Sequence, residues 1–280
     1  MSIVFYNSEY VDSSDVKISP ENRSLNYGDG FFESIKIINS KPFNFLAHFH
    51  RFTLACKTLK MNNTFSKREI VLIIEKLINK NEIVNGALKM HFSRIEGGKY
   101  CPKSSAMYLL ISTSKGQNFV LNNKESLCFY NEEVKTKGKL SNIKSANALV
   151  SVMSSLFANE KAFSNSILFN SDGNIVETSN SNIFILKNGK LFTPPTSDGC
   201  VDGTMRSWVL SQLKVTERTI SISDINNASE IFTTNAINGI ISVNKVEGQL
   251  FSEFGIANKL QVRLLDLTSI QMGANKNGMP

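Results

Sequence analysis

Apolar and polar positions along this chain follow two different periods, and the longer period predicts several amphipathic helices. In the stretch 46–59, apolar residues recur every three or four positions, as they do on the buried face of a helix. Ser66 and Glu69 have the spacing of a capping box, which predicts a helix that begins there and runs to about Ile78. Similar patterns predict helices at 145–162, from about 204 onward and at 254–267.

Shorter runs rich in β-branched and aromatic residues predict strands. They lie at 3–6, 31–38, 88–92, 107–111, 127–130, 166–169, 174–177, 182–186, 190–192 and 230–233. Lys187-Asn188-Gly189 separates two of these runs and is a good hairpin signal. Because strands and helices alternate along the whole chain, we expect an α/β fold of the mixed α+β kind.

The length and one weakly patterned stretch predict two domains. A chain of 280 residues can form two ordinary buried cores. The polar stretch 114–123 has the composition of a linker. We therefore expect a smaller N-terminal α/β domain over 1–113, a linker over 114–123 and a larger C-terminal domain over 124–280.

Composition excludes several classes of protein. The chain is 41% hydrophobic and 20% charged, as soluble globular proteins are. Its longest apolar stretch, 70–74, is far shorter than the roughly 20 residues of a membrane span. The first residues lack the basic region of a secretory signal, so we expect a cytoplasmic protein without a membrane partner.

The net charge of +7 could indicate a nucleic-acid partner. However, the lysines are dispersed on solvated helix faces and are not interleaved with aromatic residues, so we expect no such partner. Excess positive charge also suits a small anionic substrate. The four cysteines and three histidines show no ligand spacing, and we expect reduced thiols and no metal site.

Three segments carry residues that together could hold pyridoxal phosphate. Lys144 offers an amine, Glu177 offers a carboxylate, and Gly203 precedes a predicted helix start that could bind a phosphate. Taken singly, each has a simpler explanation, because a lysine is usually solvated and a glutamate can be the polar member of a strand. Their order matches what the cofactor requires: a Schiff-base amine, a partner for the pyridine nitrogen and an anion site.

The segments around these residues resemble the class-IV aminotransferase family of fold-type IV pyridoxal-phosphate enzymes. The run from Tyr27 to Glu33 is similar to the family's Tyr-Gly-Asp-Gly-x-Phe-Glu, and the run from His48 to Phe52 is similar to His-x-x-Arg-Leu. Further similar segments are Glu-x-x-x-x-Asn-Ile-Phe from Glu177, Thr193-Pro194-Pro195 and the Gly-x-x-Arg turn from Gly203. The resemblance implies a two-domain fold like that of D-amino-acid aminotransferase, with the cofactor in the interdomain cleft, and a homodimer whose sites lie near the interface.

The resemblance also implies roles for individual residues. Lys144 would form the Schiff base with the cofactor and then move protons, and Glu177 would face the pyridine nitrogen. The side chain of Arg51 and the backbone N–H groups of Thr204 and Met205 would bind the phosphate. Asn235 would add a further phosphate contact.

The resemblance leaves the reaction open between a lyase and a transaminase. Met205 stands where aminotransferases commonly have threonine, and Asn235 also departs from the branched-chain enzymes. The run 94–100 resembles a glycine-rich stretch of the lyases, although it lacks two of its glycines and has Lys99 for an arginine. The candidates for binding the substrate carboxylate are Arg94, Lys99 and Tyr100, together with Tyr27.

We therefore expect a 4-amino-4-deoxychorismate lyase, which releases pyruvate and gives p-aminobenzoate for folate synthesis. The alternative is an aminotransferase that acts on branched-chain L-amino acids or on D-amino acids with 2-oxoglutarate. A third interpretation is a non-catalytic binding protein on the same scaffold, against which the presence of both Lys144 and Glu177 argues.

Overall fold

The computed structural model describes the backbone of residues 2–274 and the side chains of residues 2–269. Its contacts divide the chain into two compact units. Unit 1 comprises Met1–Asn118 and Ile143–Asn147, and unit 2 comprises Phe119–Asn142 and Ala148–Pro280. Both units combine helices and strands, which confirms the predicted mixed α/β class.

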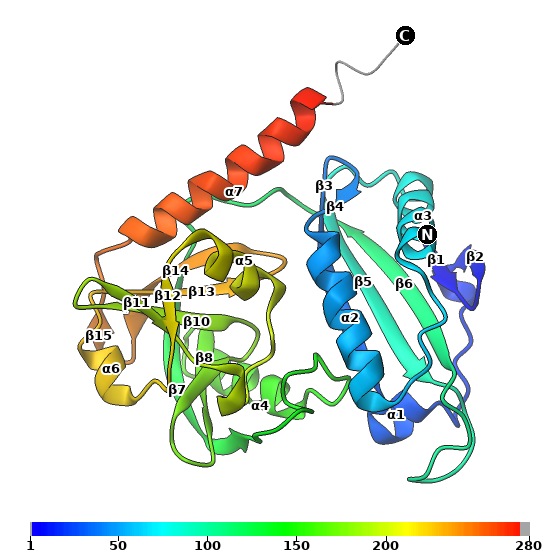
Figure 1. Ribbon diagram of the computed structural model, residues 1–280, viewed down its shortest axis with the longest axis horizontal. Helices are drawn as coiled ribbons and strands as arrows, with labels where there is room; N and C mark the ends of the chain where they lie inside the picture. The colour runs from blue at the N-terminus through cyan, green and yellow to red at the C-terminus, as the bar shows by residue number, and fades with distance from the viewer. Residues whose placement is uncertain (1, 275–280) are drawn as a thin grey trace. The chain divides into compact units, whose positions relative to one another are not determined.

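Unit 1 is a six-stranded sheet in the order β2-β1-β6-β5-β3-β4, and every pair in it is antiparallel. Its strands are β1 (Ile3–Tyr6), β2 (Glu9–Asp12), β3 (Gly30–Ile38), β4 (Lys41–Pro42), β5 (Gly86–Arg94) and β6 (Met107–Lys115). Its helices are α1 (Arg23–Tyr27), α2 (Phe45–Leu59) and α3 (Lys67–Lys80), with a 3-10 turn at Ser13–Asp15. The helices α2 and α3 cover one face of the sheet (Figure 1).

The alternation along β3 separates the two faces of this sheet. Phe31 and Ile35 are fully buried in the core with Ile70 and Ile74 of α3. Phe32 and Ser34, which alternate with them, point to the opposite face. The predicted capping box of α3 is confirmed, because Ser66 accepts from the Glu69 N–H and the Glu69 carboxylate accepts from the Ser66 N–H.

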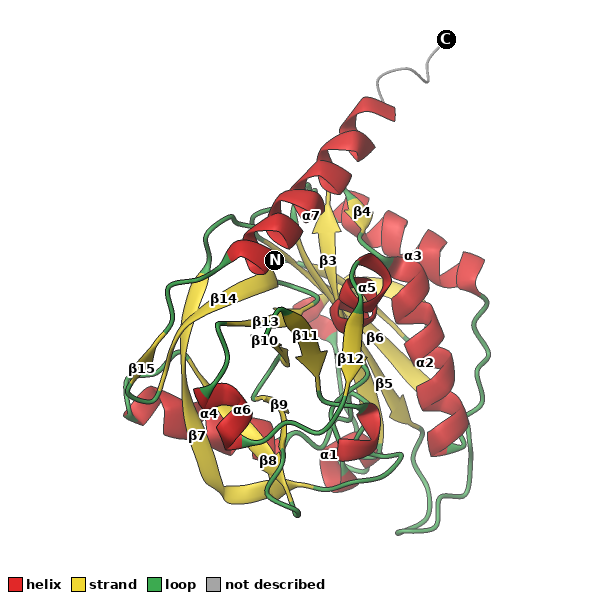
Figure 2. Cartoon of the chain, turned by 60° about the vertical axis from the view of Figure 1, so that its left-hand side comes forward, coloured by secondary structure: helices red, strands yellow, loops and turns green. Residues whose placement is uncertain are grey.

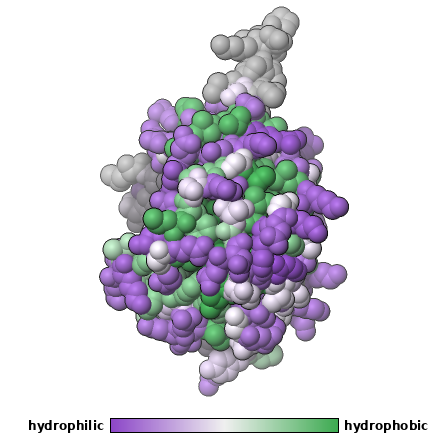
Figure 3. Space-filling model, turned by 90° about the vertical axis from the view of Figure 1, so that its left-hand side faces the viewer, coloured by the Kyte–Doolittle hydropathy of each residue, from purple (hydrophilic) through white to green (hydrophobic). Residues whose placement is uncertain are grey.

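Unit 2 is built on a nine-stranded mixed sheet in the order β12-β11-β10-β13-β14-β7-β8-β9, with β15 paired to β14. The pairs β11–β12, β14–β7 and β7–β8 are parallel. The sheet curls, so that β9 at its end contacts β10, and it encloses a core rich in isoleucine (Figure 2). On the face drawn in Figure 3, hydrophilic side chains are interspersed with hydrophobic ones.

The strands of unit 2 are β7 (Lys124–Lys135), β8 (Asn165–Asn170), β9 (Ile175–Thr178), β10 (Asn182–Lys187), β11 (Lys190–Thr193), β12 (Val215–Glu217), β13 (Glu230–Asn235), β14 (Gly239–Val246) and β15 (Gln249–Leu250). Its helices are α4 (Leu149–Glu160), α5 (Thr204–Gln212), α6 (Ile222–Asn226) and α7 (Gly255–Ala274), with a 3-10 turn at Thr196–Asp198. No helix in the described part of the chain is long and apolar enough to cross a membrane.

Most of the predicted elements are present, and the differences have local causes. The hairpin at 187–189 joins β10 and β11, with positive φ angles of 51° at Asn188 and 70° at Gly189. The predicted helix start at 145 is wrong, since α4 begins at Leu149. The preceding residues extend along β3 instead, where the Ala146 N–H donates to the Gly30 carbonyl at 3.0 Å.

Candidate active site

Lys144 lies on a short segment that pairs with β3 of unit 1. The Phe32 N–H donates to the Lys144 carbonyl at 2.9 Å, and Ser145 forms a β-bridge with Phe31. Ile143, the residue before the lysine, is buried in the core of unit 1. The Lys144 Nζ lies 4.5 Å from the centroid of the Phe32 ring. The lysine side chain therefore stands on the face of the sheet that α2 and α3 leave uncovered.

The Gly-Asp-Gly motif before β3 has a structural explanation at each position. Gly28 ends α1 with φ of 64°, a left-handed conformation that favours glycine. A Cβ at Gly30 would lie 2.5 Å from the Phe92 carbonyl oxygen, so only glycine fits there. Between them, the Asp29 Oδ2 accepts from the Nε atoms of Arg23 at 2.8 Å and Arg94 at 2.9 Å. The motif thus fixes the chain that leads to Phe32.

Arg51 is held by Glu33, the last residue of the same motif. Its Nε donates to Glu33 Oε1 at 2.8 Å and its Nη2 donates to Oε2 at 2.6 Å, in a buried bidentate pair. The His48 Nδ1 donates to the same Oε2 at 2.6 Å. Burial would raise the pKa of the Glu33 carboxyl, but Arg51 and His48 outweigh it and lower this pKa to about 2. Burial lowers the pKa of His48.

The candidates for carboxylate binding, also in unit 1, differ in how their side chains are used. Arg94 donates through Nη2 to the Leu59 carbonyl at 2.6 Å and through Nη1 to the Lys60 carbonyl at 3.2 Å. With its Nε on Asp29, each of its three nitrogen atoms has a partner. Lys99 and Tyr100 are exposed, and the Tyr100 ring lies 5.6 Å from the Tyr27 ring.

The loop that carries Lys99 and Tyr100 is anchored by hydrogen bonds from a buried arginine side chain. Arg23 is buried, and its Nη1 donates to the carbonyls of Gly98 at 3.0 Å and Lys99 at 2.6 Å. Unit 1 therefore brings Tyr27, Lys99 and Tyr100 to one loop region. Arg94 serves to hold α2 and this region together.

In unit 2, the carboxylate of Glu177 is buried at the end of β9, and both of its oxygens are used. The Lys135 Nζ donates to Oε1, and the Val201 N–H donates to Oε2 at 2.9 Å. The carbonyl of Val201 accepts from Asn182 Nδ2 at 2.9 Å. Glu177 therefore binds the N–H of Val201 and Asn182 binds its carbonyl. Together the two contacts hold the loop that leads into α5.

The N-terminus of α5 has the features of an anion site. The helix begins at Thr204 and Met205, both buried, and its N-cap Gly203 contributes no side-chain cap. The first turn of a helix directs backbone N–H groups outward without intrahelical acceptors. A Cβ at Gly203 would lie 1.9 Å from Asn182 Oδ1, so the approach to this turn depends on glycine.

A further buried polar atom lies on the strand beside Asn182. Thr234 of β13 is directly opposite Asn182 of β10, and its Oγ1 is buried without a hydrogen-bond partner among the described residues. The next residue, Asn235, donates from Nδ2 to Ser181 Oγ at 2.9 Å, and its Oδ1 accepts from the N–H groups of Ile237 and Asn238. Asn235 therefore organises the turn after β13, and its phosphate contact stays a prediction.

The contacts of the arginine in the Gly-x-x-Arg turn give it a structural role. Arg206 of the Gly-x-x-Arg turn is buried, donates to the Pro194 carbonyl at 3.0 Å and pairs with Glu217. No group of three or more metal-ligating side chains occurs within the described part of the chain.

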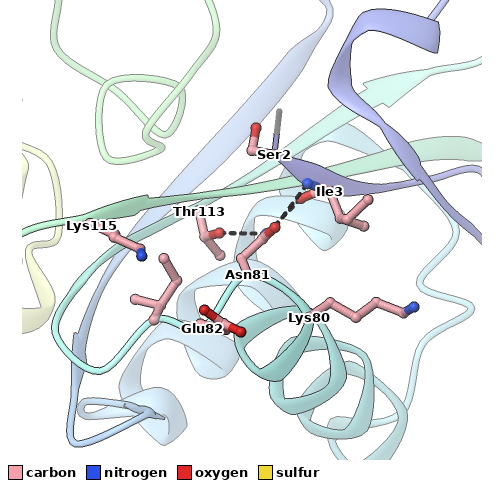
Figure 4. A pocket seen from close by; sticks show the side chains of 8 residues that line it. Ser2, Ile3, Lys80, Asn81, Glu82, Thr113 and Lys115 are labelled. Carbon is pink, nitrogen blue, oxygen red and sulfur yellow. Dashed lines mark hydrogen bonds between the residues drawn. The ribbon is translucent and has the colours of Figure 1, made fainter.

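A surface hollow of about 350 Å³ in unit 1 contains none of the predicted site residues. It is lined by Ser2, Ile3, Lys80, Asn81, Glu82, Ile83, Thr113 and Lys115 (Figure 4). The Asn81 amide in it already bonds Ile3 and Thr113.

Comparison with known proteins identifies the family. The model of the family described as Amino-transferase class IV matches residues 30–246. The chain belongs to the class IV aminotransferases. This match covers both Lys144 and Glu177 and all the phosphate-binding candidates.

Known relatives of this class IV enzyme differ in their reactions. The chain is 26% identical over 279 residues to a Methanocaldococcus jannaschii protein assigned as a branched-chain-amino-acid aminotransferase, covering 94% of this chain and 96% of that protein. It is 22% identical over 256 residues to the D-alanine aminotransferase of Staphylococcus epidermidis, covering 89% and 90%.

Solved structures show the same fold. The branched-chain aminotransferase of Thermoproteus uzoniensis superposes with a TM-score of 0.89 at 20% identity, covering 95% of this chain and 94% of that chain. The 4-amino-4-deoxychorismate lyase of Pseudomonas aeruginosa superposes with a TM-score of 0.81 at 21% identity, covering 94% and 98%.

The cofactor of this class IV enzyme is pyridoxal phosphate, as in the rest of the family. The residues present fit the group. Unit 1 carries the amine of Lys144, and unit 2 by itself carries a buried carboxylate at Glu177, a helix N-terminus beside Gly203 and the hydroxyl of Thr234, which is buried without a partner among the described residues.

Sequence reasoning missed the residues that orient these groups. Glu33 lies inside the motif that begins at Tyr27, yet its partners His48 and Arg51 are on a helix and their contact depends on folding. Lys135 and Asn182 carry no motif that distinguishes a lysine or an asparagine near a cofactor from a surface residue. One signal was available: Glu33 is an acidic residue in a predicted core strand. A buried charge requires a partner, so the sequence could have indicated that a basic residue pairs with Glu33.

Proposed function

We propose that this class IV enzyme is a 4-amino-4-deoxychorismate lyase, which releases pyruvate and leaves p-aminobenzoate. The observation that carries the proposal is Met205, buried at the first turn of α5. Where aminotransferases commonly have a threonine hydroxyl at the phosphate, this chain has a thioether that cannot make that contact. The fold shared with the lyase of Pseudomonas aeruginosa is consistent with this proposal.

The bound cofactor supplies an electron sink for the carbon that carries the substrate amino group. We propose that the Lys144 amine binds the cofactor and then takes the proton from this carbon at Nζ. The carboxylate of Glu177 holds a proton on the pyridine nitrogen. The Lys135 and Val201 contacts support this role, because they fix the carboxylate in one orientation.

We propose that the phosphate binds at the α5 N-terminus through the backbone N–H groups of Thr204 and Met205. Arg51 would add a charged contact, and Asn235 a further polar one. The bidentate pair with Glu33 supports an orienting role for that carboxylate, because it fixes the plane of the guanidinium. The substrate carboxylates would meet Tyr27, Lys99 and Tyr100, and Arg94 would act by holding their loop.

The second candidate function is an aminotransferase of branched-chain L-amino acids or of D-amino acids. The names of the relatives from Methanocaldococcus jannaschii and Staphylococcus epidermidis favour it. Both reactions use the same lysine, carboxylate and phosphate site up to removal of the proton. The two reactions diverge only after that step, so substrates rather than cofactor contacts must distinguish them.

An assay with two readouts separates the candidates. The purified enzyme is given 4-amino-4-deoxychorismate while pyruvate and p-aminobenzoate are measured, and in parallel L-leucine or D-alanine with 2-oxoglutarate while keto acid is measured. We expect the first pair of products and no keto acid. Keto-acid formation without lyase turnover would establish the aminotransferase instead.

The role of Lys144 is tested by colour. Wild-type protein with pyridoxal phosphate is expected to show a visible absorbance band that borohydride reduction abolishes. The Lys144→Ala variant is expected to lack this band, whereas Lys89→Ala, an exposed lysine on β5, is expected to keep it. A band that persists in Lys144→Ala would assign the amine to another residue.

We also propose that the enzyme is a cytoplasmic homodimer with its sites near the interface, as the family resemblance implies. The binding partner is then a second copy of the chain together with a small anionic amino-acid-type substrate.

A further inference from the structure

Glu125 is a buried acidic residue that the proposed chemistry does not use. It lies near the start of β7, two positions before Leu127, and its side chain points into the same isoleucine-rich core of unit 2. The residue is 8% exposed, and its carboxyl contacts no cationic side chain among the described residues. Burial of an acid without a counter-ion is costly, so its presence in this core requires an explanation.

The carboxyl of Glu125 joins strand β13 to strand β8. Its Oε1 accepts from the hydroxyl of Thr233 on β13, and its Oε2 accepts from Asn165 Nδ2 on β8 at 3.4 Å. The residue opposite it on β14 is the apolar Val243. The carboxyl therefore has two polar partners, and neither of them can ionise. Burial raises the pKa of the carboxyl, which favours the neutral acid.

From Asn165, the hydrogen bonds continue into the turn between β9 and β10. Asn165 Nδ2 also donates to Asn180 Oδ1 at 3.0 Å, and this oxygen accepts from Ser181 Oγ at 2.8 Å. Ser181 Oγ in turn accepts from Asn235 Nδ2 at 2.9 Å. Because Asn235 follows Thr233 by two residues on β13, these contacts close into a ring. We call it the polar ring, and its members are Glu125, Asn165, Asn180, Ser181, Asn235 and Thr233.

The polar ring lies beside groups that are proposed to bind the cofactor. Asn182, which holds the loop that leads into α5, follows Ser181 directly. Thr234 lies between the ring members Thr233 and Asn235, and its buried hydroxyl has no hydrogen-bond partner among the described residues. Buried hydroxyls normally have a partner, so this hydroxyl indicates that a polar ligand binds at this edge of the ring.

We infer that Glu125 is a positioning residue for cofactor binding, because it closes the ring that holds Asn235 in place. This inference rests on the proposed phosphate contact of Asn235. Without the carboxyl, Asn165 and Thr233 lose the group that joins them, and the turn after β13 loses one of its two supports. Glu125 acts on the phosphate through Asn235 and makes no contact of its own.

Fluorescence titration of the cofactor-free full chain with pyridoxal phosphate tests the inference. Glu125→Leu removes both hydrogen bonds, and we expect the dissociation constant to rise about tenfold or more, because Asn235 is less firmly placed. Glu125→Gln is expected to stay within about twofold of wild type, since an amide accepts from Asn165 and donates to the Thr233 hydroxyl as a neutral acid does. Wild-type affinity in Glu125→Leu, or an equal loss in Glu125→Gln, would overturn the inference.

Glu230→Leu is the matched control. Glu230 also lies on β13, its carboxyl is also buried, and burial also raises its pKa. It accepts from the N–H groups of Ile256 and Ala257 at the start of α7, outside the polar ring. We expect this variant to lose stability in urea and to bind pyridoxal phosphate like wild type. Equal losses of affinity in Glu125→Leu and Glu230→Leu would show that affinity merely follows stability, and the inference would fail.

A double variant separates this inference from the proposed function. If Glu125 acts through Asn235, Glu125→Leu adds no further loss of affinity to Asn235→Ala. Losses that multiply would overturn the inference and leave the phosphate contact of Asn235 standing. Wild-type affinity in Asn235→Ala would overturn that contact and the inference together, whatever reaction the enzyme catalyses.

A second variant decides if Glu125→Leu does not fold. Thr233→Val keeps the shape of the side chain and removes its hydrogen bond to Glu125. We expect its affinity for pyridoxal phosphate to fall about threefold or more, and an affinity equal to that of wild type would overturn the inference.

Discussion

Glu177 illustrates how one charged neighbour can support a proposed cofactor contact. Its carboxylate is buried, and Lys135 is its cationic partner. Removal of that partner leaves a buried charge uncompensated and less firmly oriented. We expect Lys135→Met to weaken the binding of pyridoxal phosphate about tenfold, or ~1.4 kcal/mol, measured by fluorescence titration of the cofactor-free protein.

Lys137 provides the control for this variant. Its Nζ pairs with Asp172 in an exposed ion pair two residues along the chain. Exposed pairs contribute little, so Lys137→Met is expected to bind the cofactor like wild type. Equal affinities of both variants would show that Lys135 does not support Glu177.

At the scale of residues, the sequence indicated the candidate groups of the site but not the residues that contact and orient them. Lys144 and Glu177 lie in segments that resemble a family, so their candidacy could be read from the chain. The Lys135–Glu177 pair joins positions 42 residues apart, and the strand pairing that brings them together is a tertiary property. A lysine with no motif is indistinguishable from a solvated one.

At the scale of elements, the Glu33 carboxylate joins strand β3 to helix α2 through His48 and Arg51. Glu33→Gln removes the negative charge and leaves the Arg51 guanidinium buried without its counter-ion. We expect a loss of about 3–5 kcal/mol in the free energy of unfolding, measured by urea denaturation. Glu75→Gln, on the exposed side of α3, is the control and is expected to change little. A loss no larger than that of the control would mean that the triad adds no net stability.

The same carboxylate predicts a pH dependence. Its pKa is lowered from 4.5 to about 2 in the folded protein. A lowered pKa contributes stability that is complete above 4.5 and disappears as the pH falls toward 2. The gap in melting temperature between wild type and Glu33→Gln is therefore expected to be largest near neutral pH and to narrow below pH 4.5. A gap that stays constant through this range would show that the pKa of Glu33 is not depressed.

Helix α5 offers a second test at this scale. Because a Cβ at Gly203 would lie 1.9 Å from Asn182 Oδ1, Gly203→Ala must displace the asparagine that holds the Val201 carbonyl. We expect the affinity for pyridoxal phosphate to fall about tenfold or more, and the affinity for pyridoxal, which has no phosphate, to change less. Gly248→Ala is the control, since open space surrounds that glycine. Equal losses for both ligands would argue against a phosphate at α5.

The start of α4 shows where sequence periodicity fails for an element. Apolar residues from Ala146 onward continue the helical pattern, and the sequence predicted a helix from 145. The backbone N–H of Ala146 instead donates to the Gly30 carbonyl, so the segment 143–147 pairs with β3 and belongs to unit 1. The hydrogen bond to Gly30 on β3 competes with the helix for the backbone of this segment and sets the start of α4. This tertiary contact cannot be predicted from the local sequence pattern.

For the whole molecule, the class of fold followed from the alternation of elements, whereas the order of strands did not. The parallel pairing of β14 with β7 joins segments more than a hundred residues apart. Strand β14 itself was missed, although Ile240, Ile241 and Val243 are buried in it. The apolar run of β14 begins directly after Asn238-Gly239, which is a turn signal, and only a few residues after β13. The sequence pattern predicted one strand in this region, β13, and not a second. Long-range pairing had to come from the structure.

Cofactor binding is expected to stabilise the folded chain as a whole, because the residues proposed to bind it come from α2, β9, α5, β13 and the segment 143–147, which are all formed only after folding. A ligand that binds only the folded state raises the free energy of unfolding by about 2.7 kcal/mol at a hundred times its dissociation constant. We expect the melting temperature to rise steadily with the logarithm of the pyridoxal phosphate concentration. Lys144→Ala is expected to show a smaller rise, and inorganic phosphate a smaller one still. A melting temperature that does not respond to the cofactor would mean that these residues do not form its site.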